Sequence, residues 1–165
     1  MNAITFGLVQ LNTTVGALKS NTEKMVILAD KAAREGAEII VFPELALSGY
    51  PPEDLILKQH FVDDCERRLD WLVKRLPSDR IVIIGSPTGS QGQTYNSAVV
   101  FYKEKLIGQY HKMLLPNYGV FDEKRVFLPG DTPGILRVGN AVIGLHICED
   151  SWFTNAQPCQ ALQPL

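Results

Sequence analysis

The sequence predicts an α/β fold in which apolar strands alternate with amphipathic helices. An apolar, β-branched run at residues 3–10 is followed by a helical pattern at 18–35 and by a second apolar run at 37–42. The same order returns further along, with a helical pattern at 60–76 and an apolar run at 80–86. The runs at 37–42 and 80–86 are apolar at nearly every position, which is typical of strands covered on both faces. We therefore expect a sheet with helices packed against it.

Composition limits the classes of protein to which the chain can belong. Its 165 residues, 45% hydrophobic and 21% charged, are ordinary for one globular domain or part of one. The net charge is −2 and the basic residues are scattered, so neither nucleic acid nor an anionic membrane is an expected partner. No apolar run reaches the roughly 20 residues that span a bilayer, and residues 1–5 lack a basic targeting segment. These features predict a cytoplasmic protein.

The three cysteines are expected to be free thiols. Cys65, Cys148 and Cys159 are odd in number and form no CxxC pair, which argues against a disulfide scaffold or a cysteine zinc site. Cys65 falls on the apolar face of the helical pattern at 60–76, so we expect it to be buried. No spacing of His, Cys, Asp and Glu resembles a metal site.

The first half of the chain presents an acid at the end of a strand. Gly36 lies where a helix C-cap glycine is expected after the pattern at 18–35. Pro43 cannot donate to a sheet ladder, so the strand at 37–42 should end there, with Glu44 just beyond its C-terminal edge. Pro51 and Pro52, followed by two acids, suit the start of a short helix.

The second half departs from simple alternation. Residues 87–93 are rich in Gly, Ser and Gln and predict a loop, after which strands at 95–102 and 105–110 flank a hairpin turn at Lys103 and Glu104. Residues 112–133 are long, turn-rich and contain several aromatics, which favours an ordered functional loop.

A last hairpin brings a cysteine to a strand end. Its strands are predicted at 135–138 and 141–147, on either side of Gly139-Asn140. It delivers Cys148 to a strand-to-helix turn, because the next three residues are polar and suit a helix N-terminus.

Three polar residues at strand ends could form a catalytic site. If the strands lie in one sheet, Glu44, Lys112 and Cys148 would meet at their carboxyl ends. A carboxylate can take a thiol proton, and an ammonium can favour the thiolate and stabilise an oxyanion, so the three make a coherent acyl-transfer site. Taken singly, each residue has a structural alternative: a capping acid, a solvated loop charge and a small core residue. The residues alone leave these alternatives open.

Three blocks of sequence resemble the signature blocks of the nitrilase, or carbon–nitrogen hydrolase, superfamily. They lie at 42–55, 112–125 and 147–152, in the order that the superfamily shows. Two of these stretches are also similar to the glutaminase domains of bacterial glutamine-dependent NAD synthetases. They are Gly-Tyr-Pro-Pro-Glu-Asp at 49–54 and Leu-Pro-Asn-Tyr-Gly-Val-Phe-Asp-Glu-Lys-Arg at 115–125. The resemblance implies a nitrilase-like αββα sandwich. Residues 1–153 would be an incomplete, N-terminal portion of this domain, and 154–165 a divergent tail.

The resemblance also implies an activity and a set of site residues. The activity would be hydrolysis of the glutamine side-chain amide through a cysteine thioester, supplying ammonia for ATP-dependent NAD synthesis from deamido-NAD. The implied catalytic residues are Glu44 as general base, Lys112 as oxyanion support and Cys148 as nucleophile. The implied substrate-site residues are Tyr118, which would contact glutamine; Glu149, whose backbone amide would complete the oxyanion hole; Glu123, which would orient Lys112; and Tyr50 and Phe121, which would line the pocket or the ammonia exit unless they only pack the loops.

Cofactors and partners follow from the same resemblance. The glutaminase step would need no cofactor, whereas ATP and magnesium would serve a synthetase domain that this sequence does not contain. The expected partners are glutamine and either a synthetase domain or a second copy of the chain. An incomplete sandwich would expose apolar faces, so we expect a poor catalyst that tends to self-associate. The alternatives are a stand-alone amidase, nitrilase or carbamoylase of the same superfamily, and an inactive fragment that acts as an interaction module. His111 and His146 are expected to be structural, because strand alternation points each away from its neighbour in the predicted site.

Overall fold

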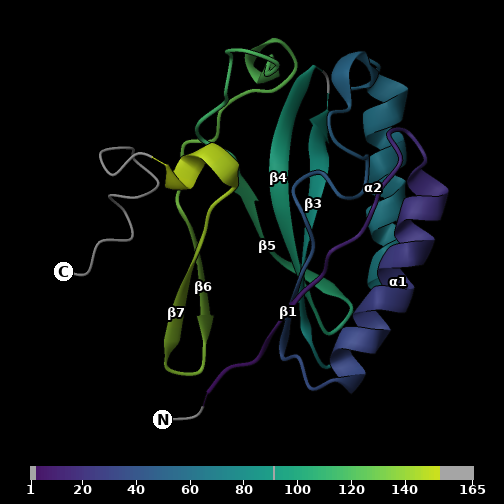
Figure 1. The fold of residues 1–165 in the computed structure, drawn as a ribbon, viewed down its shortest axis with the longest axis vertical. Coiled ribbons are helices and arrows are strands. Elements are labelled where there is room, and N and C mark those ends of the chain that lie inside the picture. Colours follow the sequence, from purple (N-terminus) through teal and green to yellow (C-terminus); the bar gives the residue numbers. More distant parts are fainter. Residues whose placement is uncertain (1–2, 91, 153–165) are drawn as a thin grey trace.

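The computed structural model describes residues 3–90 and 92–152, which form three layers (Figure 1). Helices α1 (Leu18–Arg34) and α2 (Gln59–Val73) lie side by side and cover one face of a five-stranded sheet. A two-stranded hairpin lies on the other side of this sheet. The predicted α/β class is confirmed, and the described residues form three layers of the αββα sandwich: helix, sheet and sheet. Neither helix in the described ranges is both long and apolar enough to cross a membrane.

The five-stranded sheet is mixed, with its strands in sequence order. The strands are β1 (Phe6–Leu8), β2 (Ile39–Val41), β3 (Ile81–Ser90), β4 (Gln93–Tyr102) and β5 (Lys105–His111). The first three are parallel, and β4 and β5 continue as antiparallel neighbours. Since β5 therefore runs in the same direction as β2, the residues that follow these two strands emerge at the same end of the sheet.

The strands lie in two sheets, as the predicted sandwich implies and unlike the single sheet assumed in the argument from strand ends. Strands β6 (Gly134–Val138) and β7 (Ala141–Leu145) pair only with each other among the described residues. The long segment 112–133 carries the chain away from the edge of β5, and the hairpin then packs face to face with the first sheet instead of extending it. Leu136 and Ile143 from the hairpin pack against the buried cluster that contains Val100 and Tyr110. Cys148, three residues after the end of β7, is therefore carried by the second sheet, whereas Glu44 and Lys112 follow strands of the first.

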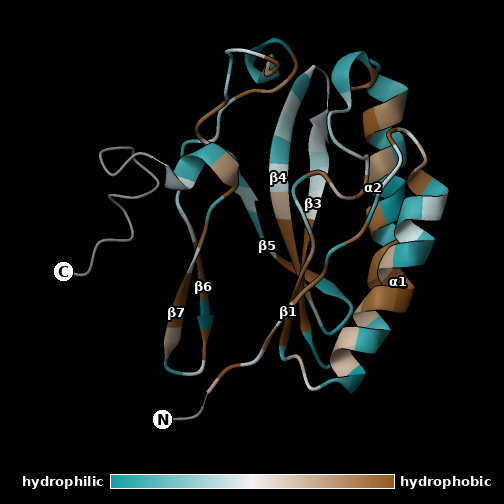
Figure 2. Cartoon of the chain, viewed as in Figure 1, coloured by the Kyte–Doolittle hydropathy of each residue, from teal (hydrophilic) through white to brown (hydrophobic). Residues whose placement is uncertain are grey.

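Two apolar clusters hold the layers together, one on each face of the five-stranded sheet. On β3, Val82 and Ile84 belong to the cluster under the helices, whereas Ile83 belongs to the cluster under the hairpin. This alternation explains why the run 81–84 is apolar at every position. In Figure 2 the middle of the sheet is brown, while both helices also carry teal, hydrophilic stretches. Cys65 on α2 is fully buried, as predicted, and burial raises its pKa to about 12.

The helix boundaries follow the prediction closely, whereas the loop predicted at 87–93 is largely wrong. Gly36 follows the C-cap residue of α1 with φ of +93°, the left-handed conformation that glycine adopts without strain. By contrast, β3 continues to Ser90 and β4 begins at Gln93. Thr88 can lie within the strand because its hydroxyl has partners on β4 and β5: its oxygen is 2.7 Å from that of Ser97 and accepts from Gln109 at 2.6 Å. The tail predicted at 154–165 lies outside the described residues, and so does Cys159.

Candidate active site

Glu44 is held on a tight turn that begins where β2 ends. Pro43 stops the strand as expected, and the next residue, Leu45, has a positive φ of +49°. The turn packs directly against the backbone of β3 at Gly85, where an added Cβ would lie 2.3 Å from the carbonyl oxygen of Pro43. The Leu47 amide also donates to the Gly85 carbonyl at 3.1 Å. The absence of a side chain at Gly85 therefore lets the turn that carries Glu44 pack directly on β3.

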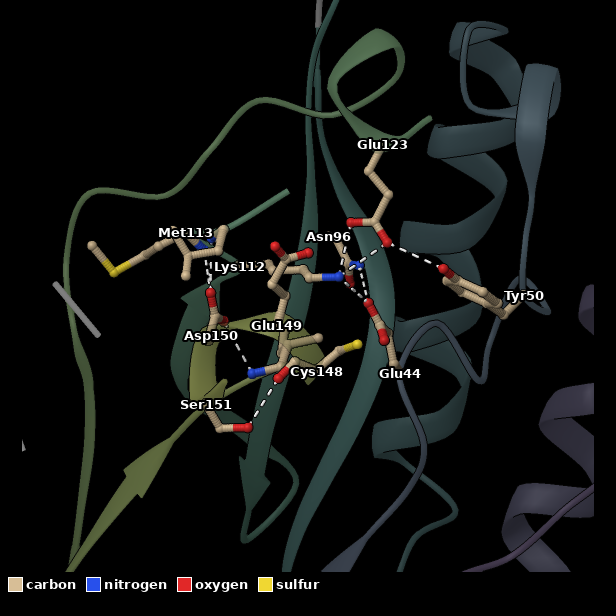
Figure 3. A network of polar contacts seen from close by, with 12 residues as sticks. Glu44, Tyr50, Asn96, Lys112, Met113, Glu123, Cys148, Glu149, Asp150 and Ser151 are labelled. Atoms are coloured by element: carbon tan, nitrogen blue, oxygen red, sulfur yellow. Dashed lines mark hydrogen bonds and ion pairs between the residues drawn. The ribbon is translucent and has the colours of Figure 1, made fainter. Parts of the chain in front are cut away.

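Lys112 lies at the centre of a buried polar cluster (Figure 3). Its side chain is fully buried, and Nζ donates to Glu44 Oε1 at 2.7 Å and to both oxygens of Glu123, at 3.0 and 2.9 Å. Asn96 on β4 donates from Nδ2 to the same Glu44 oxygen at 2.7 Å. The Lys112 backbone amide donates to the Asn96 carbonyl at 2.8 Å, which anchors the lysine to the end of the sheet. One cation is thus shared by two carboxylates.

The cluster perturbs the pKa values of its members. Burial works to lower the pKa of Lys112, but the charges and hydrogen bonds of Glu44 and Glu123 outweigh it, so the pKa is raised and the ammonium is retained. Burial raises the pKa of Glu123 against the opposing effect of Lys112. Burial and the two nearby carboxylates also raise the pKa of the Tyr50 phenol, which donates to Glu123 Oε1 at 3.3 Å. The cluster therefore keeps a cation in place while carrying an excess of acidic groups.

Cys148 enters this cluster from the opposite sheet. It follows β7 at the start of a 3-10 helix, Cys148–Ser151, and its φ of +49° is rare for a residue with a side chain. In Figure 3 its side chain points toward the Glu44 carboxylate. Partial burial and Glu44 raise the pKa of the thiol, while Lys112 and the backbone amide of Glu149 act to lower it. The net shift is upward, so the protonated thiol is the dominant form at neutral pH, and a base is needed to activate it.

Asp150 links the turn that carries this thiol to the segment that carries the lysine. Its buried carboxylate accepts hydrogen bonds from the amides of Met113 and Leu114, at 3.2 and 2.8 Å, through Oδ1. Through Oδ2 it accepts from the Tyr110 hydroxyl at 2.7 Å and from the Ile147 amide at 3.0 Å. One carboxylate thus joins β5, the residues after it and the end of the hairpin.

The predicted substrate-site residues surround the cluster. The Tyr118 hydroxyl, half exposed, donates to Glu149 Oε2 at 3.3 Å, and its ring packs edge to face on Phe121 at 5.8 Å. Tyr50, Phe121 and Glu123 line a common cavity of about 460 Å³. Neither Cys148 nor Lys112 lines this cavity, so Phe121 joins the cluster only indirectly, through Tyr118 and Glu123.

The two histidines take different positions. His111 lies on the helix side of the sheet, where Nδ1 is 2.7 Å from Ser97 Oγ and the ring stacks on Tyr95 at 4.2 Å. Burial lowers its pKa, against an opposing effect of Asp131. His146 lines a cavity of about 320 Å³ together with Cys148 and Glu44, and its structural role stays a prediction.

Three residues of the cluster escaped the sequence analysis. Asn96 is one of three buried polar residues on β4, with Thr94 and Ser97, and a buried side-chain amide is a signal that a partner is needed. Asp150 had been seen only as a helix-starting acid, and Tyr110 only as a strand residue. Their roles depend on contacts between residues 36 to 52 positions apart in sequence, on segments that meet here.

Fold and site together define the class to which the chain belongs. The family model described as carbon–nitrogen hydrolase matches residues 5–157, so the chain belongs to the carbon–nitrogen hydrolase family. Among relatives, a glutamine-dependent NAD(+) synthetase of Aquifex aeolicus is 42% identical over 147 residues, covering 88% of this chain and 26% of the relative. The corresponding protein of Synechocystis is 41% identical over 159 residues, covering 92% and 28%. This chain therefore spans about a quarter of the length of these relatives.

Solved structures agree with this assignment. A glutamine-dependent NAD+ synthetase from Acinetobacter baumannii, in complex with ADP, superposes with a TM-score of 0.82 at 37% identity, covering 91% of this chain and 28% of that one. An amidase from Nesterenkonia superposes with a TM-score of 0.76 at 24% identity, covering 89% and 56%. The second likeness shows the fold alone.

Proposed function

We propose that this chain hydrolyses the side-chain amide of glutamine through a thioester on Cys148. The observation that carries the proposal is the buried Lys112, held between Glu44 and Glu123 beside a thiol on a strained turn. The similarity to glutamine-dependent NAD synthetases supports glutamine as the amide. Ammonia would be the first product and glutamate the second.

In the first half-reaction, Glu44 takes the thiol proton while the sulfur attacks the amide carbon. A base is required because the raised pKa leaves Cys148 protonated at neutral pH. Lys112 and the backbone amide of Glu149 stabilise the negative charge that develops on the amide oxygen. Glu44 then passes its proton to the leaving nitrogen, so that the C–N bond breaks, ammonia departs and a glutamyl thioester remains.

In the second half-reaction, Glu44 accepts a proton from water as the water oxygen attacks the thioester carbonyl. The C–S bond breaks, the proton returns to the sulfur and glutamate is released. Glu123 acts on Lys112, which it holds in place through two hydrogen bonds. Tyr118 would contact the glutamine, while Tyr50 and Phe121 would line its pocket or the ammonia exit.

The fate of the ammonia is a further part of the proposal. By similarity to the relatives, it would be used for the amidation of deamido-NAD by a synthetase domain or partner in the cytoplasm. ATP and magnesium would belong to that reaction, and the amide-hydrolysing step would proceed with side chains and water alone.

The adduct that L-glutamine leaves on the enzyme tests the proposal. The chain is mixed with L-glutamine, quenched in acid and mapped by mass spectrometry, with D-glutamine, asparagine and propionamide as matched amides. We expect a glutamyl adduct on Cys148 from L-glutamine and none from the other three. Equal adducts from propionamide would instead indicate a general amidase, and no adduct from any amide would indicate an inactive interaction module.

A further inference from the structure

We infer that Asn96 is a positioning residue that determines which oxygen of Glu44 is free to exchange a proton with Cys148. The inference rests on the proposed function, because it concerns the residue that acts there as the base. Neither the predicted site residues nor the three signature blocks include this asparagine.

The hydrogen bonds of Glu44 are distributed unequally over its two oxygens. Both bonds that it accepts from described residues go to Oε1, from Lys112 Nζ and from Asn96 Nδ2, each at 2.7 Å. Two donors on one oxygen orient the carboxylate plane and leave the lone pairs of Oε2 for proton transfer. Lys112 alone would not fix this choice, since its ammonium is also shared with both oxygens of Glu123.

Asn96 is well placed to impose this orientation. It is fully buried on β4, opposite Pro87 of β3, and its own carbonyl accepts the Lys112 amide at 2.8 Å. One residue of a rigid strand therefore holds the base through its side chain and the cation through its backbone. Its orientation is also determined, because a flipped amide would bring Oδ1 against the Glu44 carboxylate, with two acceptors facing each other.

The other end of this amide argues against a purely structural role. Asn96 Oδ1 is buried and accepts no hydrogen bond from residues 3–90 or 92–152. Burying a polar group in this state costs stability, and an apolar residue of similar size would avoid the cost. The hydrogen bond to Glu44, which an apolar side chain could not make, offsets this cost.

The charged surroundings of Glu44 set the expected pH behaviour. The titratable groups that face it are Lys112 from the end of β5, Glu123 from the loop, Tyr50 from the segment after β2, and Cys148 and His146 from the end of the hairpin. A carboxylate introduced by Asn96→Asp would stand next to Glu44 Oε1 and share a proton with it. Two adjacent carboxylates hold a shared proton up to a higher pH, so the pair as a whole would accept the thiol proton less readily at low pH.

The test is the pH profile of the rate at which a diazo-ketone analogue of glutamine modifies Cys148, followed by mass spectrometry. We expect Asn96→Ala to slow the modification about ten- to a hundredfold, the range expected for losing a hydrogen bond to a charged group. We expect Asn96→Asp to move the acid limb of the profile to higher pH. The control is Ser97→Ala, the neighbouring buried polar residue on the other face of β4, which should change the rate less than about twofold.

Each outcome separates the inference from the function on which it rests. An unchanged rate in Asn96→Ala, or a slowing by the same factor at every pH in Asn96→Asp, would overturn the role of Asn96 while leaving the glutaminase site intact. Failure of the parent chain to label at Cys148 would overturn the proposed function and the inference with it. Asn96→Asp only replaces the side-chain NH₂ group by an oxygen of similar size, so its pH profile tests the inference even if Asn96→Ala does not fold.

Discussion

Strands β3, β4 and β5 carry two polar clusters on opposite faces, and the clusters differ in charge. On the face toward the hairpin, Asn96 and Lys112 meet Glu44 and Glu123. On the face toward α2, the side chains are neutral: Gln109 donates to Thr88, whose hydroxyl meets Ser97, which in turn meets His111, with successive distances of 2.6, 2.7 and 2.7 Å. Asn96 and Ser97, like His111 and Lys112, are sequence neighbours that point to opposite faces.

The difference between the clusters indicates what each is for. The neutral chain satisfies hydroxyl, amide and imidazole groups at ordinary hydrogen-bond lengths and resembles the polar bonding of any buried sheet. The charged cluster buries a cation with two acids, an arrangement that is weak evidence for stability because desolvation offsets the attraction. We therefore attribute the charged face to chemistry and the neutral face to architecture, and the following variants test that division.

Cys148→Ala should have the largest effect on reaction with glutamine. The glutamyl adduct should disappear completely, because no other described thiol is exposed. The free energy of unfolding should change by less than about 0.5 kcal/mol, since the side chain is a small, exposed one. Adduct mapping and urea denaturation give the two values. Adduct formation at Cys65 would contradict the assignment of the nucleophile.

Glu44→Gln should move two kinds of thiol reactivity in opposite directions. Labelling by the glutamine analogue should fall by about 10²- to 10⁴-fold, the usual contribution of a general base. Because partial burial and the Glu44 charge raise the pKa of Cys148, removing that charge should lower it. The midpoint of iodoacetamide alkylation against pH should therefore shift to lower pH in the variant. A midpoint that stays in place would show that Glu44 does not act on the thiol.

Lys112→Met should harm both stability and reaction. Breaking a buried ion pair from one side costs about 3–5 kcal/mol, because two carboxylates are left without their cation. Labelling should fall about 10²- to 10³-fold, as for the loss of an oxyanion donor. The stability loss should shrink as pH falls, since protonated carboxylates no longer repel each other. Denaturation at two pH values measures it, and a pH-independent loss would argue against the charge explanation.

Asp150→Asn should slow the reaction of Cys148 by displacing the turn that carries it, without changing the pKa of the thiol. The amide can accept at only one of its two ends, so donors among the Tyr110 hydroxyl and the Met113, Leu114 and Ile147 amides would lose their acceptor. We expect a loss of about 1–3 kcal/mol in unfolding free energy and a slower labelling of Cys148. The pH midpoint of iodoacetamide alkylation should be unchanged in this variant, whereas it should shift to lower pH in Glu44→Gln.

Ser97→Ala should have the smallest effect and mark the neutral face as architecture. It removes the hydroxyl between Thr88 and His111, so unfolding free energy should fall by about 1 kcal/mol. Labelling of Cys148 should change less than about twofold at any pH. A larger change in labelling would mean that the two faces are coupled through β4.

The sequence predicted most of the elements because local patterns determine them. The helix at 18–34, the turn at Pro43 and the hairpin around Gly139-Asn140 each follow from periodicity or from a residue with a fixed conformation. The segment 87–90 was predicted wrongly, because the hydroxyl of Thr88 is satisfied by Ser97 and Gln109 on other strands. Composition alone cannot show such partners.

The sequence marks candidate residues for the site, and their roles stay predictions. Glu44, Lys112 and Cys148 stand out at strand ends, but the strands that carry them lie in two sheets, so the premise of strand ends in a single sheet could not show how they meet. The sequence offers a polar amide in a strand at Asn96 and a helix-starting acid at Asp150, but it does not show which backbone and carboxylate groups these two side chains reach. Such contacts depend on the packing of the hairpin against the sheet.

The most direct measurement is labelling of the chain by a diazo-ketone analogue of glutamine, with mass mapping of all three cysteines. We predict modification of Cys148 alone, lost in Glu44→Gln and in Lys112→Met. Equal labelling of Cys65 and Cys159, or no labelling, would contradict the claim that Glu44, Lys112 and Cys148 form a site that reacts with glutamine.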